Sequence, residues 1–145
     1  MESKILNREE KIQQGKTLRE NCPRTKHADW NPSLRKWEPI TLLENSNIDR
    51  IPGLVAIRYQ RMSESPFTFF RGSAIIQARD LVNSAVSGIT VQLCGDCHLL
   101  NFGGFATPER ALVFDINDFD ETFPGPWEWD IKRLVVSFVL AAREL

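Results

Sequence analysis

The sequence predicts an α+β fold, and three of its segments carry that prediction. GITVQLCGD (88–96) has the pattern of an apolar strand that runs into a turn. NFGGFATPERALVFDIND (101–118) has the pattern of a β-hairpin. PWEWDIKRLVVSFVLAAREL (126–145) has a helical pattern whose apolar residues cover most of the surface, as in a helix buried in a larger body. Helices are expected to precede these elements.

The first part of the chain is expected to be mostly helical. Residues 3–20 mix charges with spaced apolar residues and predict a helix, and residues 41–48 predict a short one. The segment between them, 21–40, is rich in proline and polar residues and predicts an extended loop. Residues 51–62 fit a helix and a strand equally well, so both remain open.

Two more elements are predicted before the apolar strand. SPFTFFRGS (65–73) is rich in aromatic residues and predicts a strand that ends at Gly72. SAIIQARDLVNS (73–84) predicts a helix with Ser73 as a candidate N-cap. Further on, Pro108 suits the second position of a type I turn in the hairpin, and Pro126 suits the first turn of the last helix.

Composition and charge exclude several classes of protein. The 145 residues are enough for one domain, and 42% hydrophobic with 26% charged residues is typical of a folded chain. The net charge is −1 with scattered Lys and Arg, which argues against binding to nucleic acid or to an anionic membrane. The N-terminus has no apolar segment like that of a secretory signal, so we expect a cytoplasmic protein.

The stretch CGDCH (94–98) allows several interpretations. Cys-x-x-Cys-His is the attachment pattern of c-type haem, and the cysteines alone fit a redox dithiol or part of a zinc site. Haem attachment normally needs an exported protein, and the sequence does not indicate export. Zinc needs about four ligands, and this stretch supplies only three, Cys94, Cys97 and His98. A redox dithiol needs a helix N-terminus to lower its pKa, but a hairpin follows. We therefore favour Cys94 and Cys97 as small buried residues.

Carboxylates and an amide gather around the predicted hairpin. Asp96, His98 and Asn101 follow the strand, and DINDFDET, with Asp118 and Asp120, closes the hairpin. With the turn near TPER, Asn101 should lie opposite residues 116–118. An amide oxygen beside carboxylates suits Mg²⁺, and a free carboxylate beside the metal is what phosphoryl transfer needs. The alternative is an acidic, solvated turn in which Asp96 accepts from a backbone amide.

The string C-G-D-x-H-x-x-N, followed by a hairpin, D-F-D and a Trp-rich helix, resembles the core of the kinase-like fold. It is most similar to the aminoglycoside and choline phosphotransferases. From residue 27 to 143 the chain resembles more closely a bacterial family catalogued as domain of unknown function 2252. We expect a separate N-terminal helix over 1–20. Over 21–145 the resemblance implies the N-terminal part of a kinase-like domain that is truncated at its C-terminus.

The resemblance also implies roles for single residues. Asp96 resembles the catalytic base, and Asn101 and Asp118 resemble the two metal ligands of the phosphotransferases. His98 matches the second histidine of their catalytic motif and is expected to fix the shape of the loop. Asp130 resembles the helix aspartate that supports the catalytic loop through its backbone.

The chain departs from the phosphotransferase pattern at several places. Cys94 stands where those enzymes carry a histidine, and Asp120 replaces the glycine of D-F-G, where it is either a further metal ligand or part of a turn. No glycine-rich nucleotide loop and no strand-end lysine precede the motif. Arg71 is the best candidate for a contact with the nucleotide phosphates, since arginine suits phosphate; its alternative is a surface ion pair.

Two functions from different classes follow. The first is an ATP- and Mg²⁺-dependent phosphotransferase, or a nucleotidyltransferase, that acts on an unknown small-molecule or protein acceptor. The second is a non-catalytic kinase-like binding module. A thiol or metal site at Cys94 and Cys97 is a third hypothesis. The apolar helix 126–145 is also expected to favour self-association.

Overall fold

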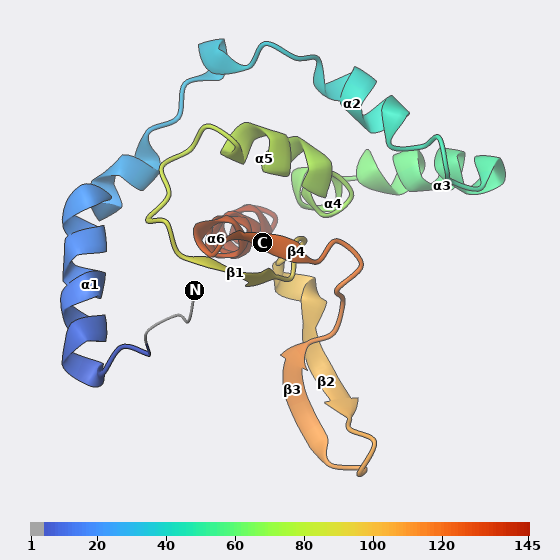
Figure 1. Ribbon diagram of the computed structural model, residues 1–145. Helices are drawn as coiled ribbons and strands as arrows, with labels where there is room; N and C mark the ends of the chain where they lie inside the picture. Colours follow the sequence, from blue (N-terminus) through green and yellow to red (C-terminus); the bar gives the residue numbers. More distant parts are fainter. Residues whose placement is uncertain (1–4) are drawn as a thin grey trace.

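The computed structural model describes residues 5–145 and combines helices with two small antiparallel sheets, which confirms the mixed α and β composition (Figure 1). The elements are α1 (Arg8–Asn21), η1 (Arg24–Ala28), η2 (Pro32–Leu34), α2 (Pro39–Asn45), α3 (Pro52–Met62), α4 (Pro66–Arg71), α5 (Ala74–Leu81), β1 (Thr90–Leu93), η3 (Leu99–Asn101), β2 (Phe102–Ala106), β3 (Leu112–Ile116), β4 (Phe123–Pro126) and α6 (Glu128–Arg143). No helix in this described range is long and apolar enough to cross a membrane.

The first helices follow their capping residues. Asn7 accepts from the backbone N–H of Glu10, whose carboxylate accepts from the N–H of Asn7, so a capping box starts α1. The prediction of a helix over 3–20 is thus confirmed from residue 8 on, and residues 3 and 4 lie outside the described part. Pro52 opens α3, which decides the ambiguous segment 51–62 in favour of a helix.

The predicted strand over 65–73 is wrong, because Pro66–Arg71 forms the helix α4. Ser65 accepts from the N–H of Thr68, and the Thr68 hydroxyl accepts from the N–H of Ser65. This reciprocal cap and a proline at the first helical position start a helix in spite of the aromatic residues. Ser73 does stand at the N-cap position of α5, but its side chain makes no capping hydrogen bond and donates to the Phe70 carbonyl at 3.3 Å instead.

The apolar strand β1 pairs with β4, an element that the sequence did not predict. Thr90 lies opposite Pro126, and Leu93 lies opposite Phe123. Pro126 therefore belongs to a strand, and the last helix begins at Glu128 rather than at the proline. Both strands of a two-stranded sheet are edges, so the missing N–H groups of Pro124 and Pro126 are tolerated there.

The predicted hairpin is present and projects from the rest of the molecule (Figure 1). β2 and β3 pair from Phe102 with Ile116 to Ala106 with Leu112. The N–H of Arg110 donates to the Thr107 carbonyl at 2.8 Å, which puts Pro108 at the second position of the turn as predicted. Arg110 has φ 63°, the left-handed value that follows such turns.

Helix α6 packs against α4, α5 and η3, but with its polar side. Its buried residues are Glu128, Arg133 and Ser137. Val135 and Phe138 are 56% and 52% exposed within the described chain. The expectation of a helix that buries an apolar face is therefore not met in this chain, because the neighbouring loop needs hydrogen-bond partners that only polar side chains supply.

Candidate functional site

The loop between β1 and β2, residues 94–101, is held by one face of α6. The Asp130 carboxylate accepts from the backbone N–H of Cys94 at 2.7 Å and of Gly95 at 3.1 Å. Seven residues further along the helix, the Ser137 hydroxyl accepts from the N–H of Leu99 at 2.9 Å. Residues 130 and 137 lie two turns apart and so share a face of the helix. Asp130 thus contacts the backbone at the start of the loop, and Ser137 contacts it near the end.

Asp96 lies in this loop with its carboxylate almost buried and one of its two oxygens in a hydrogen bond. Its Oδ1 accepts a short hydrogen bond from Nε of Arg133, and its Oδ2 lies 3.7 Å from Nε2 of His98. The backbone carbonyl of Asp96 accepts from the side-chain amide of Asn101 at 2.8 Å. The guanidinium of Arg133 compensates the negative charge of this buried carboxylate.

Arg133 is a site residue that the sequence analysis did not single out. Beyond Asp96, its guanidinium donates to Oε1 of Gln77 at 2.9 Å and to the Phe70 carbonyl at 2.8 Å, and it lies 4.2 Å from the centre of the Phe70 ring. One side chain thus joins the loop to α4 and α5. A signal was available, since Arg133 follows Asp130 by three positions and falls on the same helical face.

His98 is buried beside Asp96 and is expected to be neutral near pH 7. Burial lowers its pKa, the charges of Arg133 and Arg71 lower it further, and the Asp96 carboxylate opposes the shift. Its Nδ1 accepts from the N–H of Leu100 at 3.2 Å, so the ring proton sits on Nε2, on the side of Asp96. The histidine therefore shapes the loop and faces the carboxylate at the same time.

Asn101 and the far end of the hairpin converge, as the sequence predicted. The N–H of Asn117 donates to the Asn101 carbonyl at 3.0 Å, and the Cys94 thiol donates to the Asp118 carbonyl at 3.2 Å. The Asn101 amide nitrogen is used by Asp96, which leaves its oxygen as the atom available to a cation. Asp118 itself is exposed and accepts from the N–H of Asp120 at 3.2 Å.

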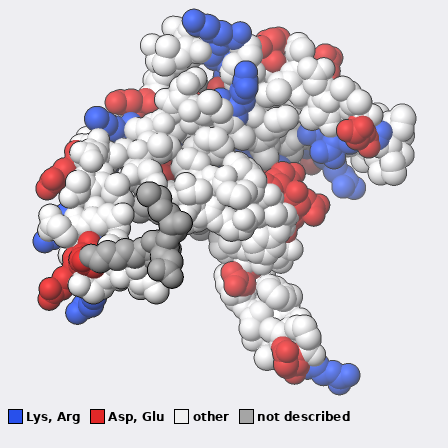
Figure 2. All heavy atoms as spheres, viewed as in Figure 1, with Lys and Arg blue, Asp and Glu red and all other residues white. Residues whose placement is uncertain are grey.

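Four carboxylates act on one another at this end of the hairpin: those of Asp96, Asp118, Asp120 and Glu121. Burial raises the pKa of Glu121, and the charges of Asp96, Asp118 and Asp120 raise it further. Figure 2 shows acidic side chains gathered beside the segment that joins β3 to β4. Glu121 is the member that the sequence analysis left out of the site. Its raised pKa indicates that these carboxylates repel one another electrostatically.

The donor set suits a hard cation, although the carboxylates do not enclose one. Among residues 5–145, no group of three or more His, Cys, Asp and Glu side chains is arranged to hold a metal ion by itself. Mg²⁺ in phosphotransfer sites commonly takes one or two carboxylates and completes its shell with phosphate oxygens and water. Asp118 and the amide oxygen of Asn101, with Asp120 or Glu121 beside them, match that partial donor set.

Arg71 is the last residue of α4 and its side chain is exposed. Its charge contributes to the lowered pKa of His98, so it acts on the same loop. It lies three positions before the first residue of α5, and a helix rather than the expected strand precedes it.

Cys94 and Cys97 are free and buried. Burial and then the charge of Asp130 raise the pKa of Cys94 to about 11 and of Cys97 to about 12. A nucleophilic or metal-binding cysteine needs the thiolate form, which these environments disfavour. The burial agrees with the interpretation of both cysteines as small core residues.

A protein-family model matches residues 50–145, which is more than half of the chain and includes every site residue named above. The family is described as an uncharacterized protein conserved in bacteria (DUF2252). No curated protein and no solved structure matches the chain. The resemblance to kinase-like enzymes has no counterpart among these matches.

Proposed function

The chain belongs to the bacterial DUF2252 family, and on that premise we propose that the loop of residues 94–101 is the centre of an ATP- and Mg²⁺-dependent phosphotransferase site. The acceptor is a hydroxyl group on a small molecule or a protein. In this reaction the acceptor oxygen bonds to the γ-phosphorus of ATP, the bond to the β–γ bridging oxygen breaks, and ADP leaves. The hydroxyl proton passes to Oδ2 of Asp96.

The observation that carries the proposal is the way α6 holds the loop. Asp130 accepts hydrogen bonds from two consecutive backbone N–H groups, and Arg133 holds the carboxylate of Asp96 beside His98. Phosphoryl transfer depends on positioning and electrostatics more than on covalent chemistry with the protein. A carboxylate held by a buried arginine is well placed to orient a hydroxyl, and the neutral His98 limits where that hydroxyl can lie.

The remaining residues have electrostatic roles in this proposal. Asp118 and Asn101 would hold Mg²⁺, with Asp120 as a further oxygen ligand, and the ion would neutralise negative charge on the phosphates. Arg71 is exposed and close enough to influence His98, so it would contact a phosphate oxygen. Burial and then repulsion by the neighbouring carboxylates raise the pKa of Glu121, and that repulsion favours the binding of a cation there.

A second function is favoured by the pairing of Asp96 with Arg133. Oδ1 of Asp96 already accepts a hydrogen bond from Arg133 and is therefore less available to an acceptor hydroxyl, which suits a site that binds a nucleotide without turnover. This binding module would use the same metal ligands. The two functions differ in whether ADP is formed.

Thermal unfolding of the chain with and without Mg-ATP tests both functions. We expect saturating Mg-ATP to raise the unfolding midpoint of the wild-type chain by about 5 °C, because a ligand that binds only the folded state stabilises it. Asp118→Ala should remove the rise. Asp115→Asn is the matched control, since Asp115 is an exposed hairpin carboxylate that accepts from the N–H of Ile116, and it should keep the rise.

Product analysis then separates the two functions. ADP formation that is lost in Asp96→Asn while the thermal shift is kept supports the phosphotransferase, and pyrophosphate in place of ADP indicates nucleotidyl transfer. A shift without any product supports the binding module. A wild-type chain that unfolds cooperatively with no shift contradicts both.

A further inference from the structure

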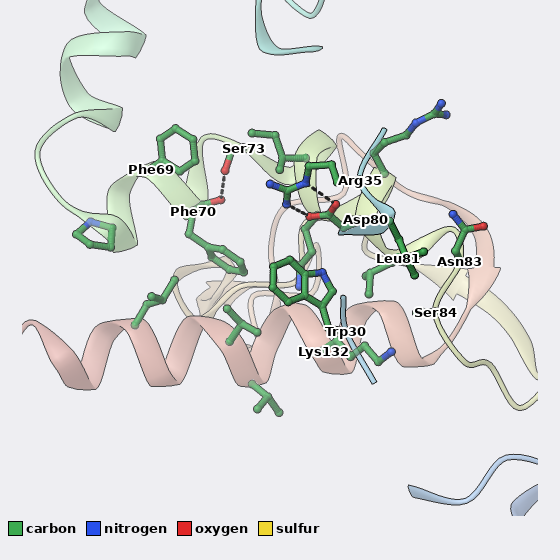
Figure 3. Close-up of a pocket in the computed structure, with 18 of the residues that line it drawn as sticks. Trp30, Arg35, Phe69, Phe70, Ser73, Asp80, Leu81, Asn83, Ser84 and Lys132 are labelled. Atoms are coloured by element: carbon green, nitrogen blue, oxygen red, sulfur yellow. Dashed lines mark hydrogen bonds and ion pairs between the residues drawn. The ribbon is translucent and has the colours of Figure 1, made fainter. Parts of the chain in front are cut away.

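A large cleft lies over α6, with a volume of about 1100 Å³. Figure 3 shows α6 as its floor, with α4, α5 and the segment that carries Trp30 and Arg35 around it. The lining residues fall within 27–84 and 131–140, so neither the loop 94–101 nor the hairpin of the same copy lines the cleft. The cleft is therefore separate from the candidate site described above.

Most of the lining is apolar, and much of it is open to solvent. Ile131, Val135 and Val136 line the floor on α6, and Phe69 and Trp30 contribute aromatic rings. All five side chains are exposed in the described chain. A large exposed apolar patch on a folded protein often marks a surface that binds another molecule. An apolar partner that filled the cleft would remove this surface from water.

The charges of the cleft favour a partner without a strong net charge. Arg35 and Asp80 form an ion pair (Figure 3). The remaining charged residues of the lining carry two charges of each sign, and none of them forms an ion pair within residues 5–145: Asp29, Glu64, Arg79 and Lys132. The Glu128 carboxylate, which lies outside the lining, also acts on Lys132. The lining therefore has no net charge, and it offers unpaired charges of both signs.

The hairpin of β2 and β3 carries exposed apolar side chains on one of its faces. Leu112 and Phe114 are 83% and 74% exposed. They are two positions apart on β3 and so point to the same side of the hairpin. Their partners on β2 are Ala106 and Gly104, which are too small to cover them. Because the hairpin projects from the molecule, this apolar face can reach a second copy (Figure 1).

The end of the hairpin matches the cleft in spacing and in charge. Leu112 and Phe114 lie about 7 Å apart along the strand. Val136 and Leu140, which line the floor one helical turn apart, lie about 6 Å apart along the axis. The turn of the hairpin carries one charge of each sign, on residues 109 and 110, and so has no net charge, like the lining of the cleft.

We propose that the end of the hairpin of one copy inserts into the cleft of a second copy, with Leu112 and Phe114 over the floor formed by α6. The hairpin and the cleft are different surfaces of the chain, so the contact joins copies head to tail. The competing arrangement places the clefts of two copies face to face. Two concave surfaces would leave their volumes unfilled, and protein interfaces pack closely, so packing favours the hairpin.

Sedimentation velocity over a range of concentrations tests the proposal. We expect the wild-type chain to form assemblies that grow with concentration. Phe114→Thr and Val136→Gln should each weaken self-association about ten-fold, because each puts a polar group into an apolar contact. The matched controls are Phe105→Thr, on the other face of the hairpin, and Val139→Gln, on α6 outside the cleft. Both control residues are exposed, and both variants should assemble like the wild-type chain.

A mixture of the two weakened variants tests the pairing of hairpin with cleft directly. Phe114→Thr keeps an intact cleft, and Val136→Gln keeps an intact hairpin. An equimolar mixture should therefore form heterodimers at a concentration at which each variant alone is monomeric. Heterodimers also show that both variants are folded. Leu112→Thr and Val135→Gln replace a variant that does not unfold cooperatively, since these residues occupy the same two surfaces.

Several outcomes would overturn the proposal. One is a mixture that stays monomeric, and another is a Phe114→Thr chain that assembles like the wild type. A wild-type chain that unfolds cooperatively but stays monomeric overturns it as well. Loss of assembly in Val136→Gln alone, with no effect of the hairpin variants, would assign the cleft to a face-to-face contact with a second copy.

Discussion

Arg133 donates its Nε–H to Oδ1 of Asp96 although 37 positions separate the two residues, and both are buried. The pair joins α6 to the loop that follows β1, and the same guanidinium reaches Gln77 and Phe70. A buried ion pair adds little stability by itself, but the loss of one partner leaves a charge without compensation. The candidate site and the packing of the helices therefore depend on the same side chain.

Arg133→Met should lower the free energy of unfolding by about 3–5 kcal/mol, because it leaves the Asp96 carboxylate buried and unpaired. Urea unfolding followed by circular dichroism measures the loss. Arg143→Met is the control, since Arg143 is exposed in the last turn of the same helix. The double variant with Asp96→Asn should lose less than the sum of the two single variants; additive losses would show that the two side chains do not interact.

Gly95→Ala should destabilise the chain by about 3 kcal/mol or more, a loss found where strain and overlap combine. Gly95 has φ 89°, and an added Cβ would lie 2.0 Å from the carbonyl oxygen of Glu121. Gly88 has φ 88° but nothing within 4 Å of the corresponding Cβ. Gly88→Ala should therefore cost only the backbone strain, about 1–2 kcal/mol. Equal losses in urea would mean that the contact with Glu121 does not matter.

Asp130→Ala should cost about 2–3 kcal/mol, because two backbone N–H groups lose a charged acceptor. The local effect is seen by hydrogen exchange, in which the amides of Cys94 and Gly95 should exchange faster than in the wild-type chain. Asp115→Ala removes an exposed carboxylate from the hairpin and should leave those two amides protected. Unchanged protection in Asp130→Ala would contradict the role of Asp130 in holding the loop.

Glu121→Gln should stabilise the chain near pH 7 by about 0.5 kcal/mol, a small value because the side chain is partly solvated. Burial and the neighbouring carboxylates raise the folded-state pKa of Glu121. The folded state thus holds the proton to higher pH than the unfolded state, and the wild-type chain loses stability as the pH rises between the two pKa values.

Urea midpoints measured from pH 4 to pH 8 check this sign. The advantage of Glu121→Gln should be absent below the unfolded pKa and complete above the folded pKa. Mg²⁺ should reduce the advantage if a cation binds among these carboxylates. An advantage that is greatest at the acidic end would contradict the assignment.

The sequence by itself determined the elements whose signals are local. The strand β1, the hairpin with Pro108 at its turn and the helix α6 all follow from short-range patterns, and a hairpin necessarily brings Asn101 to Asn117. The helix α4 is also encoded locally, in the cap formed by Ser65 and Thr68, although its aromatic residues have a propensity for strands. The sequence did not predict β4, because Pro124 and Pro126 argue against a strand and only an edge strand tolerates them.

Only the tertiary structure decided which side of α6 is buried and what the buried charges contact. By composition the helix should hide its valines, yet it buries Arg133 and Ser137 and leaves Val135 exposed. The reason is that a loop packed against a helix must satisfy its backbone N–H groups and its carboxylate, and the partners it finds are distant in sequence. The spacing of residues along a helix shows which side chains share a face. Which other segment packs against that face depends on the tertiary structure of the whole chain.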